Sequence, residues 1–273
     1  MKKLLSLILA VVMLTGCVLA LASCGPTLKV GYTVYAPMNF YDNDGDVLDG
    51  DDGTGDFVGF DTELAKLVAD KLGMKVKFIE IDWGQKYMEL DSGAIDCIWN
   101  GFTSNAKDSD GVERSEKVDF SYAYLDNAQC IVVKAENLAQ YTSADSLAGK
   151  KGTAEAGSAG ETYAKSVTTV YVDVPVQTDT FREVMSGAAQ FAVVDRLLAE
   201  NIVGNGDYAS LAIVEAIEIE KEVYSIGCRK GGDLDEKINE ALVELLNEGE
   251  IERLATKYNV RVTDSLMAKK TAN

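Results

Sequence analysis

Histidine is absent from this sequence of 273 residues. Histidine supplies the base in the common Ser-His and Cys-His nucleophile pairs, and its imidazole is the commonest metal ligand in proteins. Its absence excludes those catalytic pairs and the zinc sites that depend on imidazole. Any proton transfer would have to use carboxylate, lysine, tyrosine or cysteine side chains.

Basic residues are in short supply. The chain has 26 Lys and Arg against 44 Asp and Glu, which gives a formal net charge of −18. Because a nucleic-acid-binding surface needs an excess of basic side chains, this charge argues against nucleic acid as a partner. With three Pro and 47% hydrophobic residues, the composition is typical of a globular protein with one large domain or two smaller ones.

Cysteines are also few. Apart from two near the N-terminus, the chain has Cys97, Cys130 and Cys228, each within an apolar run. An odd number with this spacing fits neither a disulfide framework nor a zinc ribbon. We therefore predict three buried, unpaired thiols that pack as small hydrophobic side chains.

An export signal is predicted at the N-terminus. Lys2 and Lys3 are followed by an uncharged apolar run over residues 4–22. A basic start followed by such a run is typical of a signal peptide, here residues 1–23. The run is also long enough for a membrane-spanning helix, so an uncleaved membrane anchor stays open as the alternative.

The end of this run resembles the lipobox of bacterial lipoproteins. Leu21–Cys24 reads LASC, and in lipoproteins the cysteine of such a segment is acylated and becomes the first residue. The resemblance implies lipidation of Cys24, a tether over residues 24–27, and a location on the cell surface or in the periplasm. LTGC, which ends at Cys17, is the alternative. Cys24 is preferred because cleavage at Cys17 would leave the apolar VLALA on the mature chain.

From Leu28 onward the hydrophobic period switches repeatedly between that of a strand and that of a helix, which indicates an α/β fold. Strands are predicted over residues 28–34, 75–81, 95–101, 127–134, 150–156, 168–174, 190–195 and 210–217. Helices are predicted over residues 60–73, 84–93 and 233–249, and three more are predicted to start at Ser158, Thr178 and Arg196. Asp61 is the predicted N-cap of the first helix. Asp233 and Glu236 are spaced as a capping box at the start of the helix over 233–249. No Pro-, Gly- or Ser-rich linker separates the two sets of strands.

An acidic segment over residues 42–56 contains seven Asp and several Gly, so it is predicted to be a solvated loop. Its first residues are similar to a calcium-binding loop. However, Val47 stands where that loop needs glycine, and no Glu closes a twelve-residue loop, so calcium receives little support and no metal site is assigned.

Several longer segments together resemble the bacterial extracellular solute-binding proteins that serve ABC importers of polar amino acids. They include GFDTELAKLVADKL (59–72), ERSEKVDFSYAYLDNAQCIVVK (113–134) and FAVVDRLLAE (191–200). The resemblance implies a type II periplasmic-binding-protein-like fold, in which two α/β lobes are joined by two hinge strands with the ligand cleft between them. It implies lobe 1 over residues 28–125 plus 223–262, lobe 2 over 126–222, a polar tail over 263–273, and hinges near 124–128 and 220–224.

A free amino acid presents a carboxylate and an ammonium, and burying either without a partner costs several kcal/mol. The resemblance assigns Arg114 to the carboxylate and Asp195 to the ammonium. A guanidinium fork suits a carboxylate because it can hold both oxygens. Residues 106–112 look like an insertion before Arg114, which leaves Lys107 as an alternative partner, and Asp195 could also serve as the N-cap of the next helix.

The remaining ligand contacts follow from the same resemblance. Tyr35 and Trp83 are expected as aromatic walls, and Glu155 would favour a ligand with a polar or cationic side chain. The helix that starts at Ser158 would present free N–H groups, with Ser158 and Glu161 as a capping box. The full set of expected contacts, besides Arg114 and Asp195, is Thr33, Tyr35, Trp83, Gly101, Phe102, Thr103, Glu155, Ser158 and Ala159.

The sequence therefore predicts a lipid-anchored receptor that captures a free L-amino acid and delivers it to an ABC transporter permease. No catalysis, cofactor or metal is expected, and a monomer suffices for a receptor that opens and closes. Two alternatives stay open, because a fold does not determine a function. One is a secreted enzyme of the dehydratase type on the same fold, and the other is a sensory or structural surface domain.

Overall fold

The computed structural model describes residues 25–42 and 55–271. The predicted signal peptide, Cys17, Cys24 and most of the acidic segment lie outside these residues, so the predictions made for them stay predictions. Within the described ranges, no helix combines the length and the hydrophobicity that a bilayer crossing requires.

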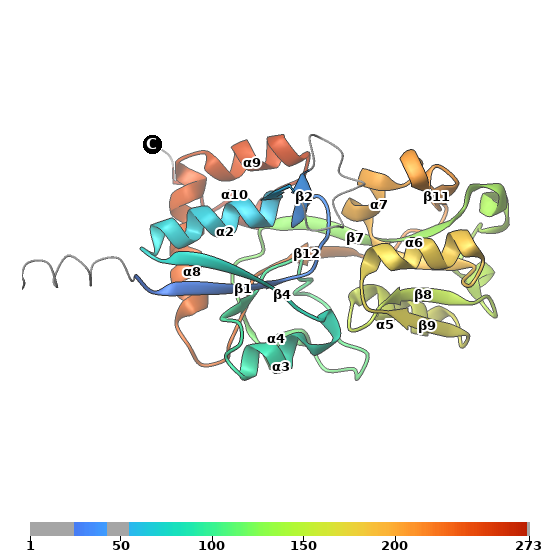
Figure 1. Ribbon diagram of the computed structural model, residues 1–273, viewed down its shortest axis with the longest axis horizontal. Helices are drawn as coiled ribbons and strands as arrows, with labels where there is room; N and C mark the ends of the chain where they lie inside the picture. Colours follow the sequence, from blue (N-terminus) through green and yellow to red (C-terminus); the bar gives the residue numbers. More distant parts are fainter. Residues whose placement is uncertain (1–24, 43–54, 272–273) are drawn as a thin grey trace, which may run out of the picture.

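Two separate sheets organise the molecule, each with helices packed on it (Figure 1). The strands are β1 (Thr27–Tyr32), β2 (Phe40–Asp42), β3 (Asp56–Val58), β4 (Lys75–Glu80), β5 (Cys97–Ile98), β6 (Asp119–Phe120), β7 (Leu125–Lys134), β8 (Gly152–Glu155), β9 (Tyr171–Val174), β10 (Phe191–Asp195), β11 (Leu211–Ile213), β12 (Lys221–Tyr224) and β13 (Gly227–Cys228). The α-helices are α2 (Phe60–Lys71), α3 (Lys86–Asp91), α4 (Arg114–Lys117), α5 (Ala159–Val167), α6 (Gln177–Ser186), α7 (Arg196–Ile202), α8 (Leu234–Asn247), α9 (Glu250–Tyr258) and α10 (Asp264–Met267). Short 3-10 helices are η2 (Trp83–Gln85), η3 (Ala135–Gln140), η4 (Ala144–Leu147) and η5 (Gly206–Tyr208).

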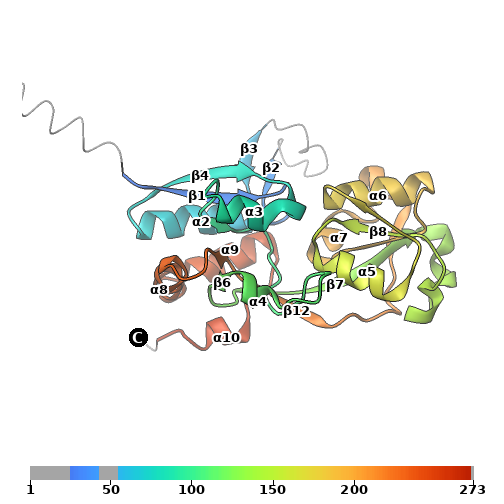
Figure 2. The ribbon, with the colours of Figure 1, turned by 90° about the horizontal axis from the view of Figure 1, so that it is seen from below.

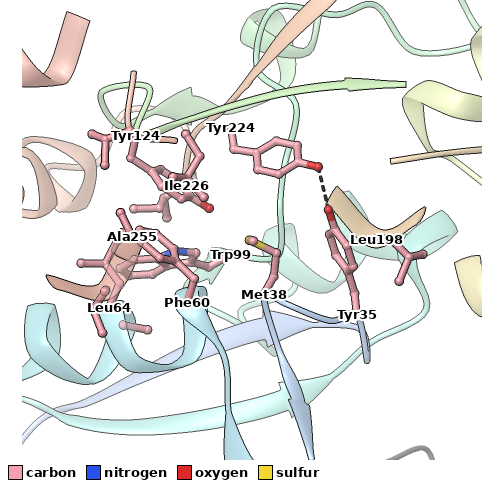
Figure 3. Close-up of a cluster of buried hydrophobic side chains, with 14 of the residues drawn as sticks. Tyr35, Met38, Phe60, Leu64, Trp99, Tyr124, Leu198, Tyr224, Ile226 and Ala255 are labelled. Atoms are coloured by element: carbon pink, nitrogen blue, oxygen red, sulfur yellow. Dashed lines mark hydrogen bonds between the residues drawn. The ribbon is translucent and has the colours of Figure 1, made fainter. Parts of the chain in front are cut away.

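The first sheet has the strand order β4-β1-β5-β13-β6. β1 pairs in parallel with β4 and β5, whereas β13, from near the C-terminus, pairs antiparallel with β5 and β6. Helices α2, α8 and α9 pack on one another beside this sheet. Their apolar side chains, including Leu64 and Ala255, meet Trp99 and Tyr124 in a continuous buried cluster (Figure 3). We call this part of the molecule the first half.

The second sheet has the order β11-β7-β10-β8-β9. β8 pairs in parallel with β9 and β10, and β7 pairs antiparallel with β10 and β11. Helices α5, α6 and α7 follow β8, β9 and β10 in the chain, as the alternating hydrophobic pattern predicted. We call this part the second half.

Two strands run side by side between the halves (Figures 1 and 2). β12 pairs antiparallel with the beginning of β7, with Lys221 opposite Ala128 and Tyr224 opposite Leu125. These are the two segments that the resemblance assigns to the hinges. The residue boundaries of the two lobes stay a prediction.

Asp61 does not cap its helix, so that prediction is wrong. α2 begins at Phe60 with Gly59 as N-cap, and Asp61 is completely buried in the first turn. Its carboxylate accepts hydrogen bonds from the Tyr124 hydroxyl and from the backbone N–H of Gly101, both at 2.8 Å. Burial raises the pKa of Asp61 to about 6. Its partners lie far away in the sequence, which is why local spacing suggested a cap instead.

The C-terminal helix also differs from the prediction. Asp233 is the N-cap of α8, but its side chain makes no capping hydrogen bond and forms an ion pair with Lys237 at 2.8 Å instead, so the capping box is not formed. The tail, expected to be polar, contains the short helix α10, in which Leu266 is fully buried.

The prediction for the thiols is confirmed, since Cys97, Cys130 and Cys228 are buried and unpaired.

Candidate functional site

Arg114 is the buried cation around which the site is built. It begins α4, and only 1% of the residue is exposed. Its Nε donates to Asp108 at 2.8 Å, Nη1 donates to the carbonyl of Thr103 at 3.0 Å, and Nη2 donates to the carbonyl of Gly157 at 3.3 Å. The Phe102 ring centre lies 5.2 Å from the guanidinium carbon. The side chain therefore reaches from the first half to the backbone of the second.

The segment taken for an insertion holds Arg114 in place. Asp108, within that segment, also accepts hydrogen bonds from the Tyr87 hydroxyl at 2.7 Å and from Lys117 at 2.9 Å. Burial alone would raise the pKa of Asp108. The charge of Arg114 and these hydrogen-bond donors outweigh burial, so the pKa is lowered. The alternative cation, Lys107, has a side chain that is 58% exposed and pairs with Glu113 at 3.3 Å. The structure thus brings Arg114, and not Lys107, into the buried cluster.

Lys86 is a second buried cation, which the sequence analysis missed. It lies in α3 and is 1% exposed. Its ammonium donates to the carbonyls of Gly157 at 2.8 Å and Trp83 at 3.3 Å. The ring centres of Trp83, Tyr87 and Phe102 lie 5.1, 4.8 and 5.9 Å from its nitrogen. Burial, followed by the charge of Arg114, lowers the pKa of Lys86 to about 7. Its spacing of three residues from Trp83 on a helical segment was the signal available in the sequence.

Asp195 is the buried carboxylate of the second half, at the end of β10. Its Oδ1 accepts hydrogen bonds from Asn127 at 2.8 Å and Gln129 at 2.7 Å, and its Oδ2 accepts one from Gln177 at 2.5 Å. Burial raises its pKa, and these hydrogen bonds oppose the rise. Asp195 also occupies the N-cap position of α7, but its side chain makes no capping hydrogen bond. The carboxylate is therefore held by side-chain amides and not by the helix that follows.

Glu222 joins the two halves. It lies on β12, and its Oε2 accepts hydrogen bonds from the Thr103 hydroxyl at 3.1 Å, Asn127 at 3.2 Å and Gln129 at 3.0 Å. Burial, followed by repulsion from Asp195, raises the pKa of Glu222 to about 7. Sequence reasoning missed this residue because its position in a strand of mixed polarity gave no functional signal. A continuous hydrogen-bonded path now runs from Arg114 through Thr103, Glu222 and Gln129 to Asp195.

Glu155 ends β8 and is the least satisfied carboxylate of this region. It is 2% exposed, and its Oε1 has no hydrogen-bond partner. Burial, followed by repulsion from Asp195, raises the pKa of Glu155 well above its ordinary value, whereas the charge of Lys86 opposes the rise. An unpaired buried carboxylate oxygen costs free energy, so a group that donates to it would be stabilising.

The other predicted residues have structural contacts of their own. The hydroxyls of Tyr35 and Tyr224 are 2.8 Å apart (Figure 3), and Thr33 donates to Asn100 at 2.6 Å. The rings of Trp83 and Phe102 meet edge to face at 5.4 Å. All of these side chains are buried.

The start of α5 is capped as predicted. The Ser158 hydroxyl accepts from the N–H of Glu161 at 3.0 Å, and the Glu161 carboxylate accepts from the N–H of Gly157 at 2.8 Å. Ala159 lines a hollow of about 530 Å³ that also touches Gln129 and Glu222. A side chain at Gly157 would place its Cβ 3.1 Å from the Lys86 nitrogen and 3.2 Å from the Gly84 Cα, and the φ of Gly157 is +73°. Close contact between the halves therefore requires glycine here.

The architecture places the chain in a class of two-lobed α/β proteins whose lobes are joined by two paired strands. The sequence profile described as "Bacterial extracellular solute-binding proteins, family 3" matches residues 28–261. The chain belongs to this family. The predicted type II periplasmic-binding-protein-like fold is confirmed.

Named relatives support the same assignment. The chain is 29% identical over 205 residues to the "Arginine-binding extracellular protein ArtP" of Bacillus subtilis (strain 168), covering 74% of this chain and 77% of the relative. It is 30% identical over 237 residues to the "L-cystine-binding protein TcyJ" of Escherichia coli (strain K12), covering 85% and 82%. Among solved structures, "An ancestral arginine-binding protein bound to arginine" superposes with a TM-score of 0.73 at 33% identity, covering 85% of this chain and 97% of that one. These proteins bind solutes, so the chain is a solute-binding protein and not an enzyme, as predicted.

Proposed function

We propose that the protein binds a free polar L-amino acid between its two halves, with Arg114 holding the carboxylate and Asp195 holding the ammonium, and delivers it to the permease of an ABC importer. The observation that supports this most directly is the hydrogen-bonded path between a buried guanidinium of the first half and a buried carboxylate of the second. An amino acid offers one group of each sign, so it can pair with both ends of that path.

Both residues keep capacity for a ligand. A guanidinium has five N–H donors, and Arg114 uses Nε, Nη1 and Nη2 once each. A carboxylate offers about four acceptor positions, and the amides that reach Asp195 occupy three of them. Arginine and cystine, which relatives bind by name, are polar amino acids with these same backbone groups.

The other residues proposed to contact the ligand surround these two. They are Thr33, Tyr35, Trp83, Gly101, Phe102, Thr103, Glu155, Ser158 and Ala159. β7 and β12 serve as the hinge, because they are the paired strands that run between the halves. The ligand favours the closed arrangement since it contacts both halves there, and the protein acts as a monomer.

The experiment is a thermal-shift panel of the twenty amino acids with cystine and ornithine, followed by titration calorimetry with each amino acid that raises the Tm. Arg114→Ala and Asp195→Asn each leave a buried ligand charge without its partner, which costs about 2 to 5 kcal/mol, or about a thirtyfold or larger loss of affinity. Arg253→Ala is the control, because Arg253 pairs with Glu250 on the surface. The proposal fails if no amino acid shifts the Tm, or if both site variants bind like the control.

Export and anchoring complete the proposed function. We infer that residues 1–23 are removed and that Cys24 carries the lipid, which fits a family of extracellular proteins. Cys24→Ser should release the protein from membranes, whereas Cys17→Ser should leave it attached. Mass spectrometry of the mature N-terminus measures the same point directly, and an unmodified Cys24 on membrane-bound protein would contradict the inference.

A further inference from the structure

Asp195 and Glu222 form a pair of buried acids at the junction, because the same two side-chain amides donate to both. The amide nitrogen of Asn127 lies 2.8 Å from Asp195 Oδ1 and 3.2 Å from Glu222 Oε2. The amide nitrogen of Gln129 lies 2.7 Å and 3.0 Å from the same two oxygens. Two oxygens that share a donor nitrogen at these distances are at most about 6 Å apart. Asp195 and Glu222 are only 6% and 9% exposed.

The groups around this pair supply little positive charge. Among the described residues, the hydrogen-bond donors to the two carboxylates are amides and the Thr103 hydroxyl, and neither carboxylate forms an ion pair. The charge of Arg114 favours ionisation of Glu222, but Arg114 is itself paired with Asp108.

The other titratable neighbours do not change this balance. Glu155 repels Asp195 and adds a third acid, whereas Lys221, next to Glu222 on β12, is exposed. Burial raises the pKa of the remaining neighbours, so they stay neutral at ordinary pH: Tyr35, Tyr224 and the thiol of Cys130.

Two buried carboxylates this close together are rarely ionised at once, because each disfavours the charged form of the other. Burial raises the pKa of both acids, and repulsion from Asp195 raises that of Glu222 further. The shared amides reduce the repulsion but bring no net charge. We therefore expect the pair to carry one proton at neutral and lower pH when no ligand is bound.

A ligand ammonium would supply the missing positive charge. In the proposed function it pairs with Asp195, and Thr103, another expected ligand contact, donates to Glu222 at 3.1 Å. On the basis of that function, we propose that the ligand ammonium displaces one proton from the Asp195–Glu222 pair, so that Glu222 acts as a second acid of the ammonium site. The carboxyl O–H bond breaks, both acids become carboxylates, and the proton passes to the solvent.

Ligand affinity should then depend on pH in one direction. The protonated pair must lose its proton before the ammonium can bind, so affinity should rise with pH by at most about tenfold per unit and level off above about pH 7. Between about pH 5 and pH 6.5 the expected gain is about tenfold. The pKa of Lys86, which burial lowers to about 7, leaves this cation mostly charged over the same range, so it contributes little to the gain.

The experiment is titration calorimetry of the full chain with L-arginine at about pH 6, in phosphate and in imidazole buffer. If L-arginine gives no shift in Tm, the amino acid of the panel with the largest shift replaces it. The two buffers differ in ionisation enthalpy, so the difference between the binding heats counts the protons exchanged. The backbone and side-chain groups of L-arginine do not titrate near this pH. The wild type should release about half to one proton per ligand, and this measurement needs no variant.

Variants then assign the proton to a residue. Glu222→Gln keeps the shape of the side chain and its acceptor oxygen but cannot titrate, so it should lose most of the proton release and most of the gain in affinity between about pH 5 and pH 6.5. Glu155→Gln should keep the release. Glu220→Gln is the matched control, because Glu220 is an exposed acid on the same segment.

The outcomes separate this proposal from the broader one. Equal binding heats of the wild type in the two buffers would show that no proton is exchanged, which overturns the proposal. Loss of the release in Glu155→Gln, with the release kept in Glu222→Gln, would overturn the role of Glu222. In both cases the amino acid still binds, so the proposed function stands. Failure of every amino acid in the panel would instead overturn the proposed function itself.

Discussion

The two halves bring opposite chemistry to the place where they meet. The first half contributes the cations Arg114 and Lys86, which are surrounded by aromatic rings and backbone carbonyls. The second half contributes the carboxylates Asp195 and Glu155, and amide donors of its own elements hold Asp195. Lys86 and Asp195 are stabilised by polar groups without an ion pair, whereas Arg114 is paired with Asp108. The difference in sign between the halves is what the proposed function uses, because a zwitterionic ligand has one group that suits each half.

The largest effect is expected when the guanidinium of the first half is replaced by a carboxylate, so that both halves contribute negative charge. Arg114→Glu would present a carboxylate to the ligand carboxylate that Arg114 is proposed to hold. Juxtaposed like charges cost several kcal/mol, so affinity for the amino acid should fall by about a thousandfold or more. Titration calorimetry measures the loss, and Arg253→Glu is the matched control on the surface. Retained affinity in Arg114→Glu would remove the guanidinium from the site.

Glu222 lies on β12, the strand that runs between the halves, so it tests the charge balance at the junction itself. Its pKa is raised from 4.5 to about 7, so the folded protein binds the proton more tightly than the unfolded chain does. The stability that this proton provides is complete below about pH 4.5 and is lost as the pH rises through about 7. The expected loss is at most ~3 kcal/mol in the free energy of unfolding.

Glu222→Gln should remove this contribution. Urea unfolding at pH 5 and at pH 8 measures it as the difference between the pH dependence of the variant and that of the wild type. Glu220→Gln, an exposed neighbour on the same segment, should behave like the wild type. Parallel curves for Glu222→Gln and the wild type would show that the carboxyl titrates normally.

Asp108 differs from the other charged groups that the first half contributes to the site, because it is an acid and they are cations. Asp108→Asn keeps the shape of the side chain but removes the charge from its ion pair with Arg114. Arg114 is then positioned less firmly, so ligand affinity should fall by about tenfold. Asp110→Asn is the control, because Asp110 is exposed and pairs only with Lys117 among the described ion pairs. An effect of equal size in both variants would mean that the loop acts through its net charge and not through this contact.

The sequence allowed prediction of the features that depend on local pattern. The alternation of strands and helices, the position of Asp195 at the end of an apolar strand, and the capping box at Ser158 all follow from residues that lie close together in the chain. The family resemblance added the crossing segments that pair as β7 and β12. The contribution of Arg114, Asp195 and the other assigned residues to ligand binding stays a prediction.

The features that the sequence analysis missed depend mainly on distant partners. Lys86 is buried because Gly157, which is 71 positions away, supplies a carbonyl. Asp61 was taken for a cap because its partner Tyr124 is 63 positions away. A periodicity analysis assigns a polar residue to a surface or a cap unless a partner is known, so buried charges with remote partners are missed.

Asp61 carries a consequence for how the molecule can bend. Its carboxylate is bonded both to Tyr124, immediately before β7, and to Gly101, immediately before Phe102. Hydrogen bonds to α2 therefore hold both the start of β7 and the loop that contacts Arg114. If the halves move as the proposed function requires, we expect the bending to take place beyond residue 124, with α2, Tyr124 and the loop at Gly101 moving together as one rigid unit.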